Sequence, residues 1–164
     1  MKKIILFLLT LALFVTLSAC GETDQTNSTA SDIPVIRLQD YTYEKIDGGI
    51  RIQFYKGFDE HVTIPDTIDG LPVVEIGPSA FDGRIFLATV VIPDTVTKIG
   101  FDAFKDCSLL TKVTLPDGLQ ELGARAFENC VLLTDITLPD GVQFVGEDAF
   151  AGCTSLANPP KSTQ

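Results

Sequence analysis

The chain has 164 residues, of which 45% are hydrophobic and 21% are charged, and this size suits one ordinary domain with a continuous core. Acidic residues outnumber basic residues by 22 to 12, which gives a formal net charge of -10. This balance argues against a nucleic acid as partner, because a phosphate backbone requires a basic face.

Residues 1–19 are predicted to be a secretion signal rather than a membrane-spanning helix. Two lysines precede an apolar run over residues 4–15, and residues 17–20 read Leu-Ser-Ala-Cys. This ending resembles the lipobox of bacterial lipoproteins, in which the cysteine becomes the lipidated first residue of the mature chain. We therefore expect a lipid on Cys20 and an extracytoplasmic protein anchored at the cell surface. The competing interpretation is an ordinary signal peptide cut near Ala19.

Residues 20–33 are predicted to be the lipidated cysteine and a disordered tether. A single alanine is the only apolar residue between 21 and 32, so burial cannot offset the entropy of ordering this segment. Removal of the signal takes away two lysines and leaves 10 basic against 22 acidic residues, a net charge of -12. Such a charge would push the domain away from an anionic membrane surface.

Residues 34–158 are predicted to form one domain, which residues 159–164 follow as a tail. It opens with β-rich runs over 41–46 and 50–55 on either side of Asp-Gly-Gly, so we expect a hairpin cap at about 41–58. Alternation along the second run predicts that Ile50, Ile52 and Phe54 share one face.

Four repeats follow over about residues 59–158. Each contains an Ala-Phe pair three residues after a glycine, and the pairs recur every 23 residues. The pairs are Ala80-Phe81, Ala103-Phe104, Ala126-Phe127 and Ala149-Phe150. This regular spacing predicts a stacked-repeat solenoid in which the four phenylalanines lie in one file inside the coils.

Each repeat also predicts a short alternating strand that stops at a proline. The strand cores are 62–64, 90–92, 113–115 and 136–138, and their central residues point outward. The Ala-Phe segments are expected to form short helical turns. Five extra residues, 69–73, enlarge the first copy and are expected to bulge as a surface loop.

Three features of the repeat resemble the BspA-type leucine-rich repeat family over residues 41–156. They are the Leu-x-x-Val/Ile-x-Leu/Ile-Pro strand, the Ile-Gly-x-x-Ala-Phe segment and the closing Cys-x-x-Leu step. The resemblance implies a right-handed, mostly β leucine-rich-repeat solenoid, a bacterial surface location and adhesion to host proteins or other cells. The chain departs from the family in two ways. Arg84 replaces the repeat cysteine in the first copy, and there are about four copies, whereas family adhesins usually have many more.

The repeat cysteines Cys107, Cys130 and Cys153 occupy equivalent positions. Adjacent coils lie close enough for a disulfide between two of them, but pairing would leave one thiol over. We favour a ladder of buried thiols, since cysteine is among the most buried residue types. No zinc site is expected, because the cysteines lack close paired spacing and His61 is the sole histidine.

One aspartate follows the strand proline in every copy. The four are Asp66, Asp94, Asp117 and Asp140. Carboxylates stacked one per coil could share a calcium ion. The simpler interpretation, which we favour, is turn chemistry, in which each side chain accepts a local backbone hydrogen bond.

The function indicated is binding without catalysis, since a solenoid displays surface rather than enclosing a pocket. No cofactor is expected, and the partner would be a protein or a glycan. The outward strand positions are the candidate contact surface, and they suit a plain solvated sheet face equally well. These positions are His61, Thr63, Thr89, Val91, Lys112, Thr114, Asp135 and Thr137.

The C-terminal end of the stack offers a second candidate. The residues after Leu156 are too few for a capping hairpin, so we expect Ile136, Leu138 and Phe150 to be partly uncovered. Phe144 adds to this apolar surface, since charged residues occupy its position in the two preceding copies. End-to-end self-association would follow, although Ser155 and the two prolines at 159–160 could form a minimal cap.

Overall fold

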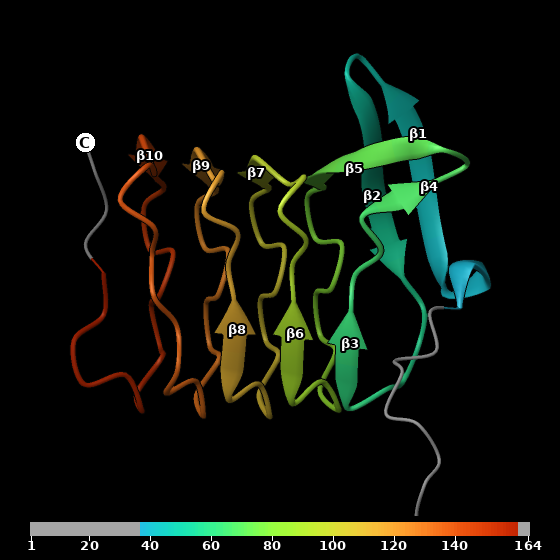
Figure 1. Cartoon of the computed structure of the whole chain (residues 1–164). Coiled ribbons are helices and arrows are strands. Elements are labelled where there is room, and N and C mark those ends of the chain that lie inside the picture. The colour runs from blue at the N-terminus through green and yellow to red at the C-terminus, as the bar shows by residue number, and fades with distance from the viewer. Residues whose placement is uncertain (1–36, 161–164) are drawn as a thin grey trace, which may run out of the picture. The chain divides into compact units, whose positions relative to one another are not determined.

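A computed structural model describes residues 37–160, which wind into a β-solenoid of about four turns. The predicted signal segment, Cys20 and the tether lie outside the described residues. Figure 1 shows the coils side by side, with short strands forming one sheet along each of two sides. In the described part of the chain, no helix is long and apolar enough to cross a bilayer.

The strands form two sheets, which we call sheet A and sheet B. Sheet A has the order β1 (Tyr41–Ile46), β2 (Gly49–Tyr55), β5 (Leu71–Ile76), β7 (Lys98–Ile99), β9 (Glu121–Leu122) and β10 (Phe144–Val145), and β4 (Thr67–Ile68) pairs with β5. Sheet B has the order β3 (His61–Thr63), β6 (Thr89–Val91) and β8 (Lys112–Thr114). The helix η1 (Leu38–Asp40) is a single turn that precedes β1.

The predicted hairpin cap is confirmed, with one correction. β1 and β2 pair antiparallel around Asp47-Gly48, and Ile50 and Ile52 are fully buried. Phe54 does not share their face and is 38% exposed. The register shifts between Thr42 and Tyr43, where the pairing skips Gln53. This β-bulge shifts by one residue the alternation of inward and outward side chains, so Tyr55 is buried in place of Phe54.

The insertion at residues 69–73 is not a surface loop, as expected from the sequence, but part of a hairpin. β4 pairs antiparallel with β5 through a two-residue turn, Asp69-Gly70. Both turn residues have positive φ, 52° and 75°, which is the conformation of the tight hairpin turn that Asp-Gly favours. β5 then enters sheet A between β2 and β7, so the insertion links the cap to the repeats.

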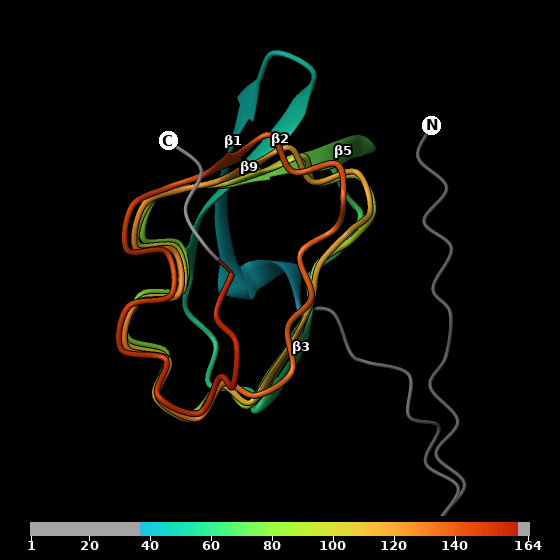
Figure 2. The ribbon, with the colours of Figure 1, turned by 90° about the vertical axis from the view of Figure 1, so that its left-hand side faces the viewer.

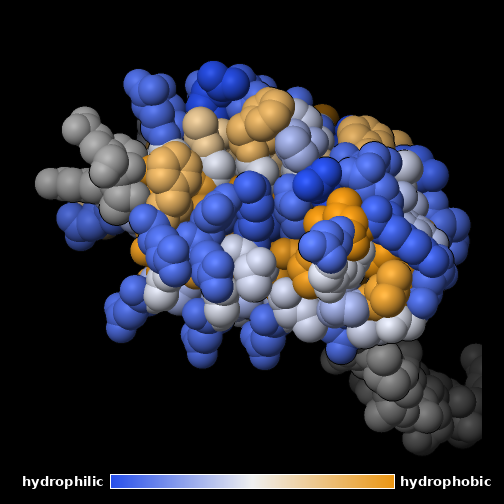
Figure 3. Space-filling view, turned by 90° about the horizontal axis from the view of Figure 1, so that it is seen from above, coloured by the Kyte–Doolittle hydropathy of each residue, from blue (hydrophilic) through white to orange (hydrophobic). Residues whose placement is uncertain are grey.

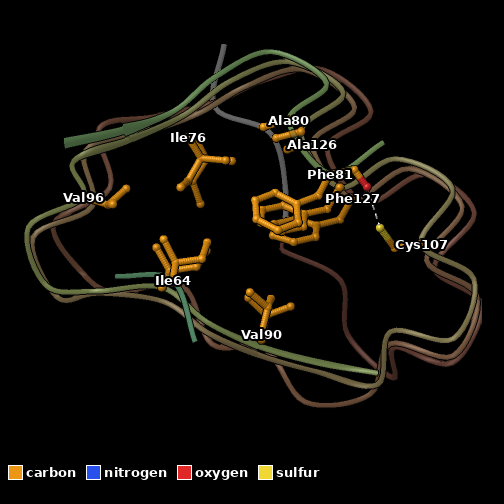
Figure 4. Packing of buried hydrophobic residues seen from close by; sticks show 14 of the residues in the cluster. Ile64, Ile76, Ala80, Phe81, Val90, Val96, Cys107, Ala126 and Phe127 are labelled. Atoms are coloured by element: carbon orange, nitrogen blue, oxygen red, sulfur yellow. Dashed lines mark hydrogen bonds between the residues drawn. The ribbon is translucent and has the colours of Figure 1, made fainter. Parts of the chain in front are cut away.

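A file of stacked rings fills the interior of the coils, as the spacing predicts. The ring centroids of Phe81, Phe104, Phe127 and Phe150 are 4.8, 5.2 and 5.6 Å apart in sequence order, and Figure 4 shows Phe81 and Phe127 aligned in this file. Tyr55 extends the file at the cap, 5.0 Å from Phe81. Offset stacking adds to the free energy gained from burial, so the file joins the coils into one core.

The Ala-Phe segments are hydrogen-bonded turns rather than helical ones. Two positions in each turn adopt positive φ, and one of them is occupied in successive copies by Gly83, Asp106, Asn129 and Gly152. These residue types tolerate the left-handed conformation best, which explains the choice of residue there. The adjacent coils also approach closely: a Cβ built on Gly100 would lie 2.7 Å from the backbone nitrogen of Pro78.

The C-terminal end is more covered than the sequence indicates. Ile136 and Leu138 are half-buried, as expected, but Phe150 is only 7% exposed. Pro159 and Pro160 line the same small hollow as Phe150, and Figure 2 shows the last described residues, in red, crossing the face of the final coil. The expectation of an uncovered Phe150 is therefore wrong, because this segment covers the ring.

Phe104→Ala is expected to lower the free energy of unfolding by about 3 to 5 kcal/mol, because it removes a fully buried ring between two others. That is a large share of the stability of a small domain. Urea unfolding followed by circular dichroism measures the change. Phe101→Ala is the control, since this ring is 51% exposed and its loss should change stability by less than about 0.5 kcal/mol. Equal effects of the two substitutions would contradict the ring file as the centre of the core.

Candidate functional site

Parallel pairing of the strands arranges the candidate residues of sheet B in two columns. His61, Thr89 and Lys112 are paired neighbours, and an isolated bridge from Lys112 to Asp135 continues this first column into the fourth coil. Thr63, Val91 and Thr114 are paired neighbours in the second column. The intervening Val62, Val90 and Val113 are buried in the core, which fixes the outward direction of both columns.

The first column is held by side-chain contacts between coils. His61 Nδ1 lies 2.9 Å from Thr89 Oγ1, and Lys112 Nζ donates to Asp135 Oδ2 at 2.6 Å. The Lys112–Asp135 ion pair is more than half exposed on both sides, so solvent screening leaves it little weight in stability. Its polar groups are therefore available to a partner at small cost.

Four of the eight candidates surround one shallow hollow. Lys112, Thr114, Asp135 and Thr137 line it together with Asp117, and its volume is about 250 Å³. The hollow forms where regular strand pairing stops, because the fourth coil contributes only the bridge at Asp135 and no strand. The candidates from the first two coils lie outside this hollow, on the flat part of sheet B.

The aspartates that follow the strand prolines, at 66, 94, 117 and 140, are all exposed. Thr67 Oγ1 donates to Asp66 Oδ1 at 3.3 Å, a local contact within the turn. Among residues 37–160, no group of three or more histidine, cysteine or acidic side chains is placed to hold a metal ion. The turn role of the four aspartates stays a prediction.

The three repeat cysteines are free and buried, as the ladder interpretation predicts. Each thiol donates to the carbonyl of the phenylalanine in the preceding coil, at 3.1 Å for Cys107 and Cys130 and at 3.0 Å for Cys153. Figure 4 shows the contact from Cys107. Burial raises the pKa of Cys107 to about 12, so its nucleophilic thiolate form is suppressed.

Cys107 is expected to resist alkylation by iodoacetamide at pH 8 in the folded protein and to react after denaturation in guanidinium. The protonated thiol predominates below its raised pKa, and the core excludes the reagent. Mass spectrometry of peptides measures the modified fraction with and without denaturant. Ser108→Cys supplies the control, since position 108 is half-buried and should react without denaturant. Rapid labelling of Cys107 in the folded protein would contradict the buried ladder.

Sequence analysis missed a third exposed column, on the corner of each coil just before sheet B begins. Phe58, Phe86, Leu109 and Leu132 occupy equivalent positions there and are 75%, 52%, 46% and 43% exposed. The signal was present, because an apolar residue directly precedes the buried leucine in three consecutive copies. The repeat pattern considered above includes the closing leucine but not the residue before it.

The fold and the repeat together identify the family. A sequence profile described as "BspA type Leucine rich repeat region (6 copies)" matches residues 74–160. The chain belongs to the BspA-type leucine-rich repeat family. None of the curated proteins compared with the chain matches it.

Solved structures of bacterial leucine-rich repeat proteins are similar to the chain. A leucine-rich repeat protein of T. pallidum is 33% identical, with a TM-score of 0.62, over 74% of this chain and 69% of its own. One from Bacteroides capillosus is 30% identical, with a TM-score of 0.63, over 75% of this chain and 94% of its own. A leucine-rich cell surface protein of Faecalibacterium prausnitzii is 32% identical, with a TM-score of 0.60, over 77% of this chain and 42% of its own.

Proposed function

We propose that this BspA-type protein is a lipid-anchored module of the bacterial cell surface that binds other proteins in adhesion-type contacts. The observation that carries the proposal is sheet B, where inter-coil pairing aligns two outward columns of exposed and half-buried residues into one continuous face. The similar protein of Faecalibacterium prausnitzii is described as a cell surface protein, which supports an extracytoplasmic location. The partner is a protein or a glycan on a host or neighbouring cell.

The size of the face determines how it works. Four coils at about 4.8 Å and five residues at about 3.3 Å give roughly 300 Å² in projection. A stable interface needs about 800 Å² from each partner. One copy is therefore a weak binder, and many anchored copies acting together would supply the effective concentration that adhesion requires.

We assign the protein no catalytic role and no cofactor. His61, the sole histidine, contacts the hydroxyl of Thr89, and the three thiols donate to backbone carbonyls inside the core. A hydrolase of the cysteine or serine type needs a base within reach of its nucleophile, and the thiols lack one in the described residues. This arrangement supports binding over catalysis.

A second candidate function is that of a structural envelope component that self-associates through its C-terminal end. Phe144 favours it, because this ring is 49% exposed on β10, the edge strand of sheet A. Viewed from the sheet A side, apolar residues lie in separate patches among hydrophilic ones (Figure 3). An edge strand with an exposed ring can extend the sheet into another copy.

Cys20→Ala is expected to move the protein from the membrane fraction to the soluble or secreted fraction, because two or three acyl chains hold a lipoprotein at the membrane. Fractionation of the producing cells and immunoblotting measure the distribution. Ser18→Thr serves as the control and should leave the protein with the membranes. If Cys20→Ala also stays there, the lipid anchor is wrong.

Thr114→Arg is expected to weaken ligand binding by about tenfold, because a long charged side chain would fill the hollow beside Lys112 and Asp135 on the last strand of sheet B. Binding is measured on arrays of immobilised extracellular-matrix proteins and glycans. Thr42→Arg is the matched control, since position 42 is an exposed strand threonine of the cap. A ligand that binds both variants equally would exclude sheet B as the site, and ligand-free oligomers that Phe144→Glu disrupts would support the second candidate.

A further inference from the structure

The third exposed column forms an apolar ridge along the solenoid. We define the ridge as Phe58, Phe86, Leu109 and Leu132, flanked by Ile85 and Val131. It follows the edge where β3, β6 and β8 begin, at the bottom of Figure 1. The rings of Phe58 and Phe86 are 6.5 Å apart in an edge contact, so the ridge is continuous from the cap into the first coil.

The ridge is large for the surface of a monomer. At about 200 Å² per phenylalanine, the two rings alone expose roughly 250 Å². With the four aliphatic residues the total is on the order of 500 Å², within the range of patches that commonly serve interactions. Scattered apolar residues need no explanation, but four in adjacent coils and in register do.

Charged residues follow the ridge on both sides. Asp82, Lys105 and Glu128 occupy equivalent positions on the side away from sheet B, and Lys105 pairs with Glu128 at 2.7 Å. His61, Lys112 and Asp135 belong to the first column of sheet B on the other side. The signs alternate from coil to coil along the first side, while on the sheet B side the charged residues are Lys112 and Asp135 and the first two positions are His61 and Thr89.

We propose that the ridge is the contact surface of an antiparallel homodimer. The two-fold axis crosses the ridge at right angles, between Phe86 and Leu109. Phe86 then packs against Leu109 of the second copy, and Phe58 against Leu132, so every ridge position is covered. In this register Lys105 faces Asp82 of the second copy as an opposite charge, Lys112 faces the uncharged Thr89, and His61 lies opposite Asp135. Apolar overlap and charge thus select the same arrangement.

The parallel arrangement is disfavoured by the same charges. If the two-fold axis ran along the ridge, the side of one copy that faces away from sheet B would lie against the sheet B side of the other copy. Lys105 would then face Lys112, and Glu128 would face Asp135. These like-charge contacts raise the free energy of the parallel dimer and therefore favour the antiparallel one.

The dimer goes beyond the proposed ligand binding and would form whether or not sheet B binds a ligand. Its antiparallel geometry leaves both copies of sheet B on the same side. Two faces of roughly 300 Å² each then lie next to one another, which approaches the area of a standard binding surface. The ridge itself is smaller than 800 Å², so the dimer is weak in solution and is favoured by confinement to a surface.

Sedimentation equilibrium of the compact unit Ile33–Gln164 tests the association, since all core residues lie between Tyr41 and Leu156. Wild type is expected to dimerise with a dissociation constant on the order of 10⁻⁴ M. Leu109→Glu should weaken the dimer at least tenfold, and Phe144→Glu should not, although the two residues are similarly exposed. Thermal melts check that each variant is folded. A monomer at about 1 mM, or loss of the dimer through Phe144→Glu alone, overturns the proposal.

Disulfide trapping in the full chain tests the orientation. Chains carrying Phe86→Cys and chains carrying Leu109→Cys are produced together, and mixed disulfides are quantified on non-reducing gels. We expect the mixed pair to exceed both like pairs, because positions 86 and 109 face each other across the axis. Predominance of the Phe86→Cys like pair indicates parallel packing and overturns the antiparallel geometry. Ligand binding by the Thr114→Arg variant is measured separately, so failure of one proposal is distinguishable from failure of the other.

Discussion

Backbone hydrogen bonds between consecutive coils are the constraint on which the rest of the structure depends. The amides of Phe81, Phe104 and Phe127 donate to the next coil at Ala103, Ala126 and Ala149, at 2.7 to 2.8 Å. These bonds fix the separation of coils at the strand spacing of a sheet, about 4.8 Å. Ring centroids stacked 4.8 to 5.6 Å apart fit this spacing, and a glycine is required at position 100 because the backbones come so close.

Because of the same constraint, residues at equivalent positions of successive coils lie in a line along the solenoid. Phenylalanines and thiols form lines inside, while ion pairs between residues 23 apart form lines outside, such as Lys98–Glu121 at 2.7 Å and Arg125–Asp102 at 2.8 Å. A substitution in one copy therefore acts on two neighbours at once. For this reason the faces of sheet B and of the ridge depend on how successive coils are aligned rather than on any single residue.

Periodicity made the interior and the outward columns of sheet B predictable, because both follow from a fixed repeat and from strand alternation. Features that break the period were not predictable from the repeat pattern. The bulge at Gln53 shifts the register by one residue, and nothing in the local pattern distinguishes Phe54 from Tyr55. The Asp69-Gly70 turn did carry a hairpin signal, but its partner strand β5 is recognisable only once it joins sheet A. The hollow beside Thr137 depends on how the fourth coil pairs, which is a tertiary property.

The N-terminal cap shows how one end of the stack is closed. Asp59 stands where the later coils place the buried leucines Leu87, Leu110 and Leu133, and Tyr55 donates to its carboxylate at 2.7 Å. This hydrogen bond and the guanidinium of Arg37 hold the pKa of Asp59 below its ordinary value. A charged, hydrogen-bonded group thus ends the leucine column in contact with water and blocks the addition of another coil there. Since this end is closed, a partner is expected at the long faces, where the columns of sheet B and the ridge lie, or at the C-terminal end, where Phe144 is exposed.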